Sequence, residues 1–378
     1  MAPINQRVNI KADGRQRIQS IQIETTSKCN MSCATCLKSE YPKVWQERDM
    51  DLNLFARIIG QLKQTKPTVH LQGWGEPLLQ KNFLDYVKLL KNEKICTSFT
   101  TNGSVMHARL ASELIESGLD GITFSMAGFR SATHDELRGE GSLTRVKNAI
   151  TIIAGTRKRL NQTQPILAVS YILTPQTVKE LPQAISWCRK AGIDNFVTVN
   201  LTQSGGKTQH GLRFLLSKEK SKEYYFTRIL AHIGALPGKM KLDMQPFFPT
   251  LSPVCDKNPL NKLFISADGD VAPCVFLAPP VKGKIIWYSN TGQKSQSSLQ
   301  MGNMGHLTLK EIWEGEKYRK FRRQFRQRKE YYDKRLGRVS YSLSGAKELE
   351  DAVMGIQHYF RSHPPPRECL RCAKIDGY

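Results

Sequence analysis

Residues 17–36 read RIQSIQIETTSKCNMSCATC, a short alternating strand that leads directly into three cysteines. Cys29, Cys33 and Cys36 are spaced C-x3-C-x2-C. A 4Fe–4S cluster has four irons and a structural zinc ion takes four ligands, so three thiolates leave one metal position open. The spacing alone allows three interpretations: an iron–sulfur cluster with an open iron, a zinc ion completed by another residue, or cysteines that are close by coincidence.

The strand at residues 17–24 is the first of six predicted strands. The others cover residues 68–72, 95–101, 121–126, 166–173 and 195–201. Apolar residues recur at helical spacing in the stretches between them, as Phe55, Ile58 and Leu62 do in the first. Strands that alternate with helices predict a parallel sheet, either open or curved into a partial barrel.

The alternation ends near residue 206, and the remainder of the chain follows another pattern. Residues 217–233 predict a helix, residues 262–276 a hairpin that turns at Asp268-Gly269, residues 282–303 a loop, and residues 308–335 a basic helix. We therefore expect four segments: an N-terminal extension (1–17), a core domain (18–215), a linker or helix (216–249) and a C-terminal domain (250–378).

The composition and the pattern of apolar residues predict where in the cell the protein is located. The chain has 378 residues, of which 40% are hydrophobic and 8% aromatic, as in ordinary globular proteins. Its first residues are polar and do not resemble a secretory signal. No run approaches the roughly 18 apolar residues of a membrane-spanning helix. We expect a cytoplasmic protein, in which thiols stay reduced and clustered cysteines indicate a metal site or catalysis.

The formal net charge is +23, and much of the excess lies in one segment. Residues 317–338 contain eleven Lys and Arg residues against two acids. This basic segment is either a solvated face or a site for an anionic substrate or acidic peptide. Nucleic acid is not favoured, because no other nucleic-acid module is visible. Phe321 and Phe325 share one face of the predicted helix, which should pack on the protein.

Further motifs follow the later strands in order. Residues 73–77 (GWGEP) follow the second strand, residues 100–103 (TTNG) the third, and Ser125 ends the fourth. Arg138 lies in HDELRG (134–139), and Leu201 ends the sixth strand. Each motif has a structural explanation when taken singly; GWGEP, for example, reads as a turn. Taken together, they lie where active sites are built in parallel α/β folds, at the carboxyl ends of the strands.

In this order and beside C-x3-C-x2-C, the motifs resemble the radical S-adenosylmethionine (radical SAM) superfamily over residues 18–205. The resemblance implies that Cys29, Cys33 and Cys36 hold a 4Fe–4S cluster whose open iron binds S-adenosylmethionine (SAM). It implies that Glu76 contacts the SAM amino group and that Ser125 and Arg138 contact its carboxylate. The complete implied set of SAM-binding residues is Gly73, Gly75, Glu76, Pro77, Thr100, Asn102, Ser125, Arg138 and Leu201.

The sequence departs from that family's pattern at three places. Thr35 stands before the third cysteine, where an aromatic residue is usual. Trp74 replaces the second of two paired glycines, and the aspartate of an S-x-D-G motif is absent after Ser125.

Four more cysteines lie in the C-terminal domain: Cys255, Cys274, Cys369 and Cys372. The spacing of the first two around Gly269, and the stretch MGNMGHLTLKEIW (301–313), resemble the SPASM domain, which binds auxiliary 4Fe–4S clusters. The resemblance implies that the four cysteines close one auxiliary cluster; a zinc site with four thiolates is the alternative. The two other cysteines, Cys96 and Cys188, are expected to pack in the core.

Together the resemblances imply an α/β fold, a partial (β/α)6 TIM-like barrel with a smaller C-terminal α+β iron–sulfur domain. They imply an oxidoreductase or maturase that reductively cleaves SAM to a 5′-deoxyadenosyl radical and abstracts hydrogen from its substrate. The auxiliary cluster is expected to relay electrons while a peptide is oxidised or cross-linked, or an anionic small molecule is modified. The expected reductant is a flavodoxin or ferredoxin. The alternative is a non-catalytic zinc or iron–sulfur module that binds nucleic acid through its basic face.

Overall fold

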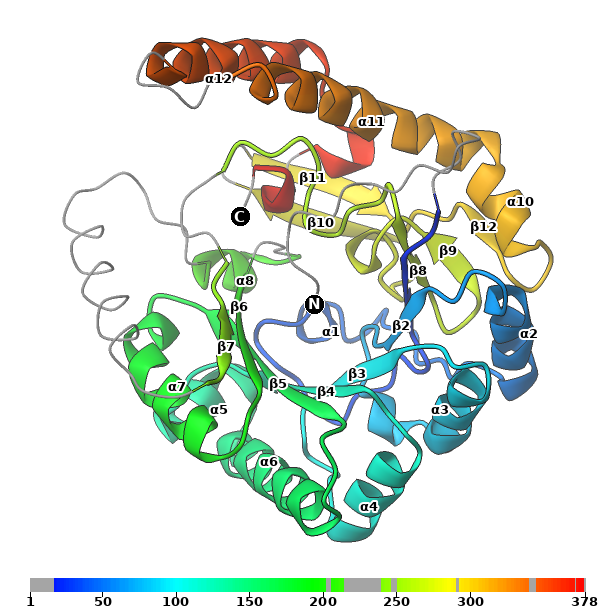
Figure 1. The fold of residues 1–378 in the computed structure, drawn as a ribbon, viewed down its shortest axis with the longest axis vertical. Helices are drawn as coiled ribbons and strands as arrows, with labels where there is room; N and C mark the ends of the chain where they lie inside the picture. The colour runs from blue at the N-terminus through cyan, green and yellow to red at the C-terminus, as the bar shows by residue number, and fades with distance from the viewer. Residues whose placement is uncertain are drawn as a thin grey trace.

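The computed structural model describes residues 17–201, 205–213, 239–245, 250–289, 292–339, 345–370 and 372–376. The predicted helix at 217–233, almost all of the N-terminal extension and most of the predicted linker lie outside these residues. Within them, the main feature is a curved sheet of ten strands surrounded by helices (Figure 1).

The six predicted strands are present, parallel and paired in chain order, which confirms the partial barrel. They are β1 (Ser20–Ile23), β2 (Thr68–Leu71), β3 (Thr97–Thr101), β4 (Gly121–Met126), β5 (Ile166–Leu173) and β6 (Asn195–Asn200). β7 (Lys241–Asp243) extends the sheet beyond β6. In β4, β5 and β6, buried residues alternate with half-buried ones, because one face packs on the helices and the other faces the interior of the barrel.

The helices of the barrel lie outside the sheet (Figure 1). They are α2 (Leu52–Leu62), α3 (Phe83–Asn92), α4 (Ala108–Glu116), α5 (Ser131–Arg138), α6 (Ser142–Arg159) and α7 (Leu181–Lys190). In α2, Phe55, Ile58 and Leu62 recur at helical spacing and are buried, and Asp51 caps the first turn. No helix among the described residues is both long and apolar enough to cross a bilayer.

Three strands of the C-terminal part of the chain join the same sheet. β8 (Lys262–Ile265) pairs in parallel with β1, and β9 (Asp270–Ala272) and β12 (Gly302–Asn303) continue the sheet in antiparallel pairing. β8 and β9 form the predicted hairpin. Gly269 in its turn has φ +83°, a left-handed conformation that glycine adopts readily.

One predicted loop is wrong. Residues 282–303 contain a second hairpin, formed by β10 (Lys284–Ser289) and β11 (Gly292–Ser297). β11 (GQKSQS) is polar and carries little strand signal, whereas β10 (KIIWYS) contains β-branched and aromatic residues that favour a strand and that the loop prediction overlooked. Ile285 packs with Leu37 of helix α1 (Leu37–Glu40), and Tyr41 accepts a hydrogen bond from the backbone of Ile286. These contacts to residues that directly follow the first cysteine loop hold the hairpin against the barrel.

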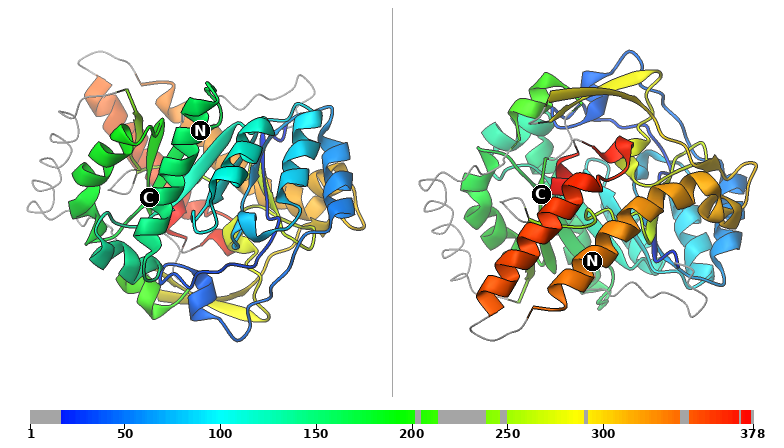
Figure 2. Two further views of the ribbon diagram at one scale, coloured as in Figure 1. Left: turned by 90° about the horizontal axis from the view of Figure 1, so that it is seen from below. Right: turned by 90° about the horizontal axis from the view of Figure 1, so that it is seen from above.

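The predicted basic helix is two helices, α10 (Leu309–Glu314) and α11 (Glu316–Leu336), which meet at Gly315. A further helix, α12 (Gly345–Ser362), was not predicted; it lies beside α11 (Figure 2). The rings of Tyr331 and Tyr359 stack at 3.8 Å between them. Phe321 and Phe325 are buried, as predicted.

The two remaining cysteines differ in burial. Cys188 is 0% exposed on α7, as predicted. Cys96 is exposed, so its predicted core position is wrong. β3 begins one residue later, at Thr97, which is buried, and the alternation of the strand turns the preceding side chain outward.

Glu24 joins the two halves of the sheet at the carboxyl end of β1. Its carboxylate is 1% exposed and accepts hydrogen bonds from the backbone N–H groups of Trp74, at 2.6 Å, and Ala267, at 3.3 Å. Trp74 follows β2 and Ala267 follows β8, so one side chain fastens the loops of both neighbours of β1. Burial raises the pKa of Glu24 to about 7, although the two N–H groups oppose this rise.

This raised pKa predicts a pH-dependent loss of stability. Because the pKa of Glu24 is about 7 in the folded protein against 4.5 ordinarily, the folded state binds the proton more tightly, and the contribution of Glu24 to stability falls as pH rises from about 4.5 to 7. Glu24→Gln has no such titration. The unfolding free energy of the variant minus that of the wild type should therefore rise by about 3 kcal/mol across this interval.

Urea unfolding at several pH values under anaerobic conditions measures this difference. The variant must be compared with the wild type because His70 and His134 titrate in the same pH range with the opposite effect on stability. Burial lowers the pKa values of both histidines to about 4, and their contribution is the same in the two proteins. A difference that stays constant from pH 4.5 to 7.5 would contradict the prediction.

Candidate functional site

The three cysteines that follow β1 share one loop, which ends in α1. Cys29 and Cys36 are half-buried, and Cys33 is 9% exposed. The backbone N–H of Cys36 donates to the carbonyl of Cys33 at 2.9 Å, and the Ser39 hydroxyl donates to the same carbonyl at 2.8 Å. These bonds form a compact turn that keeps Cys33 and Cys36 close together.

The environment of these thiols does not favour their charged form. Burial raises the pKa of Cys36 to about 12 and also raises the pKa of Cys29, and Cys33 adds to both shifts. The positive charges of Arg138, near Cys36, and Lys38, near Cys29, act in the opposite direction. Three adjacent thiolates therefore need further positive charge, which a metal cluster provides when it binds them.

The GWGEP loop after β2 packs closely against the residues that precede Cys29. A Cβ atom at Gly75 would lie 2.3 Å from the carbonyl oxygen of Thr26 and 2.5 Å from that of Lys28, so the loop admits only glycine there. The backbone N–H of Glu76 donates to the Lys28 carbonyl at 2.8 Å. The loop is therefore fixed to the backbone of the cysteine loop.

Gly73 and Pro77 shape the two ends of the GWGEP loop. A Cβ atom at Gly73 would lie 2.3 Å from Oε1 of Glu24. Pro77 begins a 3-10 helix, η1 (Pro77–Leu79), for which the Glu76 side chain provides the N-terminal cap. Proline suits this first position because no hydrogen bond is needed from its nitrogen.

Glu76 connects the loops after β2 and β3. Its carboxylate is 2% exposed and accepts hydrogen bonds from the Thr101 hydroxyl and the Asn102 backbone N–H, both at 2.7 Å. Burial raises the pKa of Glu76, and these hydrogen bonds oppose the rise. The side-chain nitrogen of Asn102 lies 4.0 Å from Sγ of Cys29. The structure thus brings GWGEP, TTNG and the cysteine loop together.

Thr100 and Thr101 point in different directions because side chains alternate along a strand. The contact with Glu76 is made by Thr101, which lies in TTNG but is not among the implied SAM-binding residues. The Thr100 hydroxyl instead lies 3.0 Å from Nε2 of His70, whose other ring nitrogen contacts Ser98 at 2.8 Å. The alternation of residues 68–72 could have placed His70 in the barrel, but a single histidine gave no functional signal.

The remaining predicted residues come from α5 and from later strands. Arg138 ends α5, is 8% exposed, and its carbonyl oxygen lies 4.0 Å from Sγ of Cys33. The backbone N–H of Ala34 donates to the carbonyl of Leu137 at 2.9 Å, so HDELRG packs on the cysteine loop. Ser125 and Leu201 are half-buried at the ends of β4 and β6. All predicted SAM-binding residues thus belong to one edge of the sheet or to α5.

Trp74, the departure from the family pattern, connects the GWGEP loop to the C-terminal part of the chain. Its indole N–H donates to the carbonyl of Val275 at 3.2 Å. Its ring packs edge-on against Phe276 and Trp45, each at 6.1 Å between centroids. Val275 and Phe276 directly follow Cys274, so Trp74 links the two groups of cysteines.

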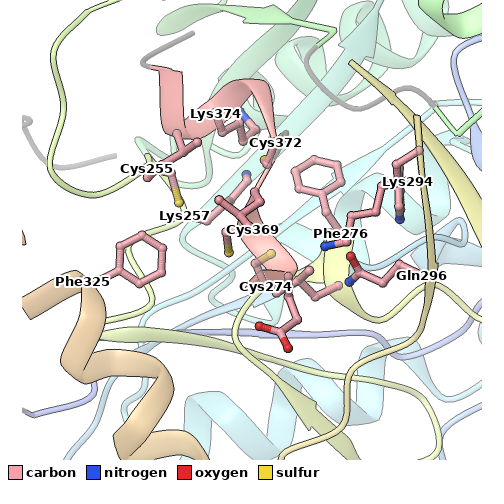
Figure 3. A pocket seen from close by; sticks show the side chains of 15 residues that line it. Cys255, Lys257, Cys274, Phe276, Lys294, Gln296, Phe325, Cys369, Cys372 and Lys374 are labelled. Atoms are coloured by element: carbon pink, nitrogen blue, oxygen red, sulfur yellow. The ribbon is translucent and has the colours of Figure 1, made fainter. Parts of the chain in front are cut away.

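The C-terminal group of cysteines lines one cavity of about 40 Å³, shown in Figure 3: Cys255, Cys274, Cys369 and Cys372. The sulfur atoms of the first three face a common space, and Phe325 of α11 lies beside Cys255. The backbone N–H of Cys372 donates to the carbonyl of Cys369 at 3.1 Å, in a tight turn after η4 (Arg367–Cys369). The structure therefore brings together four cysteines from distant parts of the sequence.

The chemistry of this second group suits a cluster. Burial raises the pKa of Cys274 to about 12 and also raises those of Cys255 and Cys369, and the negative charges of neighbouring thiolates add to each shift. Among the described residues, no three His, Cys, Asp or Glu side chains converge on a single metal ion. Four thiols are a complete set of protein ligands for a closed 4Fe–4S cluster.

Known proteins show similarity to both parts of this arrangement. Residues 23–163 match the radical SAM superfamily model, and residues 255–335 match the model of an iron–sulfur cluster-binding domain, SPASM. The first match contains Cys29, Cys33 and Cys36, and the second contains Cys255 and Cys274.

Two curated proteins illustrate the sequence similarity. A tungsten-containing aldehyde ferredoxin oxidoreductase cofactor-modifying protein of Pyrococcus furiosus is 25% identical over 305 residues, which are 80% of this chain and 82% of that protein. A probable GTP 3′,8-cyclase of Methanocaldococcus jannaschii is 26% identical over 219 residues, which are 56% of this chain and 64% of that protein.

Two solved structures share the fold. Streptococcus suis SuiB bound to S-adenosylmethionine has a TM-score of 0.59 at 16% identity, over 79% of this chain and 66% of that one. The anSMEcpe structure with bound AdoMet and the Cp18Cys peptide has a TM-score of 0.54 at 16% identity, over 91% of this chain and 99% of that one. The solved structures show the fold, and the two domain matches show that the chain is a member of the radical SAM superfamily with a C-terminal SPASM domain; these domains imply a 4Fe–4S cluster, an auxiliary iron–sulfur cluster and a site for S-adenosylmethionine.

Proposed function

We propose that this radical SAM enzyme abstracts hydrogen from a peptide or an anionic small molecule and passes an electron to its auxiliary cluster. When bound, the catalytic cluster and SAM supply a 5′-deoxyadenosyl radical, and the auxiliary cluster supplies a one-electron acceptor. The observation that carries the proposal is that the two groups of cysteines differ in their number of thiols. Three thiols leave a metal position open for SAM, and four can close a cluster.

We assign Cys29, Cys33 and Cys36 as the ligands of the catalytic cluster. Their shared loop, their burial and the nearby positive charge of Arg138 support this assignment. The residues around the cysteine loop orient the side chains that contact SAM. The hydrogen bonds from Thr101 and Asn102 hold Glu76 in one position, where its carboxylate can receive the SAM amino group.

The other SAM contacts follow the same edge of the sheet. We assign Ser125 and Arg138 to the SAM carboxylate. The close approach of the GWGEP backbone to the cysteine loop, which Gly73 and Gly75 permit, leaves backbone groups near the ligand. Pro77, Thr100, Asn102 and Leu201 complete the proposed set.

We assign Cys255, Cys274, Cys369 and Cys372 as the ligands of the auxiliary cluster. With all four positions taken by the chain, substrate cannot readily bind to it directly, which favours electron relay. Trp74 supports a relay because it joins the SAM-binding loop to the backbone beside Cys274.

The relatives support a small anionic substrate more than a peptide. The curated proteins that resemble the chain in sequence are a cofactor-modifying protein and cyclases of GTP, an anion. The peptide in the anSMEcpe structure belongs to a protein that shares only the fold. We further propose a cytoplasmic location and a flavodoxin or ferredoxin as reductant. The nucleic-acid-binding alternative is supported by the basic segment alone.

Replacing each group of cysteines tests the division of roles. The variant Cys29→Ala/Cys33→Ala/Cys36→Ala should keep about half of the roughly eight irons of two 4Fe–4S clusters and produce no 5′-deoxyadenosine from SAM and dithionite. The variant Cys369→Ala/Cys372→Ala should lose the other half and still cleave SAM. Iron, sulfide and 5′-deoxyadenosine are measured after anaerobic reconstitution, with Cys96→Ala as the control that changes none of them. Stoichiometric zinc, or loss of cleavage in a folded second variant, would contradict the assignment.

A second substitution tests the role of Glu76. Glu76→Gln removes the charge that would bind the SAM amino group, so SAM affinity should fall by about tenfold or more while the iron content stays unchanged. Equilibrium dialysis of the reconstituted protein with labelled SAM measures the affinity.

The matched control is Asp120→Asn. Asp120 also accepts a backbone N–H, that of Thr97 at 2.7 Å, but at the opposite end of the strands. The control should bind SAM as the wild type does. Equal weakening by both substitutions would assign Glu76 a general structural role.

A further inference from the structure

The cavity of the four auxiliary cysteines has a buried lysine in its wall. Lys374 lines this cavity together with all four cysteines, and its side chain is 6% exposed (Figure 3). A buried ammonium group is costly unless another charge or several hydrogen bonds balance it. An apolar side chain of similar length would pack as well at this position. Packing alone therefore does not account for a charged residue here.

An ion pair joins Lys374 to the residue that follows Cys255. The Nζ atom of Lys374 lies 3.0 Å from Oδ2 of Asp256, which is exposed, so the charge of this carboxylate remains in contact with water. Asp256 directly follows Cys255, and Lys374 is two residues after Cys372. The pair thus connects the first of the four cysteines to the last, across 118 positions of the chain.

The backbone beside each of these two cysteines forms a tight turn. The backbone N–H of Asn258 donates to the carbonyl of Cys255, and that of Ile375 donates to the carbonyl of Cys372, both at 3.0 Å. Each member of the ion pair lies inside one of these turns. Because the turns are fixed locally, the contact between the two charged side chains holds one turn against the other.

The charged side chains in the cavity wall are mostly cations. Lys257, Lys294 and Lys374 line the cavity, against one acid, Glu368. The Nζ atom of Lys257 lies 3.9 Å from the same oxygen of Asp256, so this carboxylate is shared by two of the three lysines. Four thiolates give a bound 4Fe–4S cluster a net negative charge, which a wall with an excess of cations complements.

We propose that the ion pair between Asp256 and Lys374 closes the auxiliary site, and that the ammonium group of Lys374 raises the reduction potential of the cluster held there. This rests on the proposed assignment of the four cysteines as ligands of that cluster. Asp256 is a positioning residue, because it fixes where the ammonium group stands. Both side chains keep their charges, and no covalent bond forms or breaks.

The two charges act on the cluster in opposite directions. Reduction adds negative charge to the cluster, so a nearby cation favours the reduced state and raises the potential, whereas a nearby anion lowers it. A higher potential makes the auxiliary cluster a better electron acceptor, which is the role proposed for it. The lysine therefore serves the electron relay, and the aspartate holds the lysine in place.

Lys374→Met and Asp256→Asn test the proposal, because each removes one charge and keeps most of the side-chain volume. Potentiometric EPR titration of the reconstituted full-length protein in the Cys29→Ala/Cys33→Ala/Cys36→Ala background measures the auxiliary midpoint potential. Lys374→Met should shift the reduction equilibrium tenfold, which lowers the potential by about 59 mV for a one-electron couple. Asp256→Asn should raise the potential. Shifts of both variants in the same direction would indicate a loosened site and contradict the electrostatic role.

The closing role has its own measurement. Each single variant should lose auxiliary iron to a chelator severalfold faster than the wild type, because one turn is no longer held against the other. Asp256→Lys/Lys374→Asp exchanges the two charges. It should restore slow iron loss and still show a lowered potential, since the cation no longer lies in the cavity wall. Fast iron loss from the exchanged pair would contradict the closing role.

Lys91→Met is the matched control. Lys91 also forms an ion pair, with Asp120 at 2.6 Å, but at the opposite end of the strands. The control should leave both the auxiliary potential and the rate of iron loss unchanged.

Two outcomes separate this inference from the function on which it rests. Lys374→Met and Asp256→Asn proteins with the wild-type potential and the wild-type rate of iron loss would overturn the inference and leave the proposed function intact. A wild-type protein that takes up only the iron of one cluster would overturn the auxiliary ligand assignment itself, and this inference with it.

Discussion

The parallel pairing of β8 with β1 is the contact on which both groups of cysteines depend. β1 leads into the loop of Cys29, Cys33 and Cys36, and β8 leads through its hairpin to Cys274. Adjacent parallel strands end at the same edge of a sheet, so this pairing places the turn after β8 beside the first cysteine loop, and β9 then runs back antiparallel to β8 and leads to Cys274. Glu24 and Trp74 then connect the loops directly, and neither site can move far without the other.

The basic segment shows that one helix can use its charges in two ways. Most of its cations are exposed, but Arg322 and Arg328 are buried and pack on aromatic rings. Arg328 also donates to the carbonyls of Pro253 and His363, which ties α11 to α12 and to the residues before Cys255. The formal net charge counts the exposed and the buried cations alike. The buried cations hold α11, the helix that borders the auxiliary cavity, in place.

Much of the site could be predicted because its signals are local. The three-cysteine loop and GWGEP each lie within a few residues, and each is followed or preceded by a strand with clear alternation. Thr101 was missed because only the register of β3 decides which of two adjacent threonines meets Glu76. The hairpin of β10 and β11 was missed because β11 is polar and because the hairpin is stabilised by Leu37 and Tyr41, far away in the sequence. Cys96 was misplaced because side chains alternate along the chain there, and its neighbours Ile95 and Thr97 are the buried ones.

The amino-acid sequence by itself determined the order of the strands, the incomplete ligand set after β1 and the four cysteines that could complete a second one. Those features follow from residue type, spacing and alternation, which need no knowledge of distant contacts. Only the tertiary structure decided that the four distant cysteines share one cavity and that Trp74 joins the two sites. These features depend on contacts between residues far apart in the chain, and a local sequence pattern does not reveal such contacts.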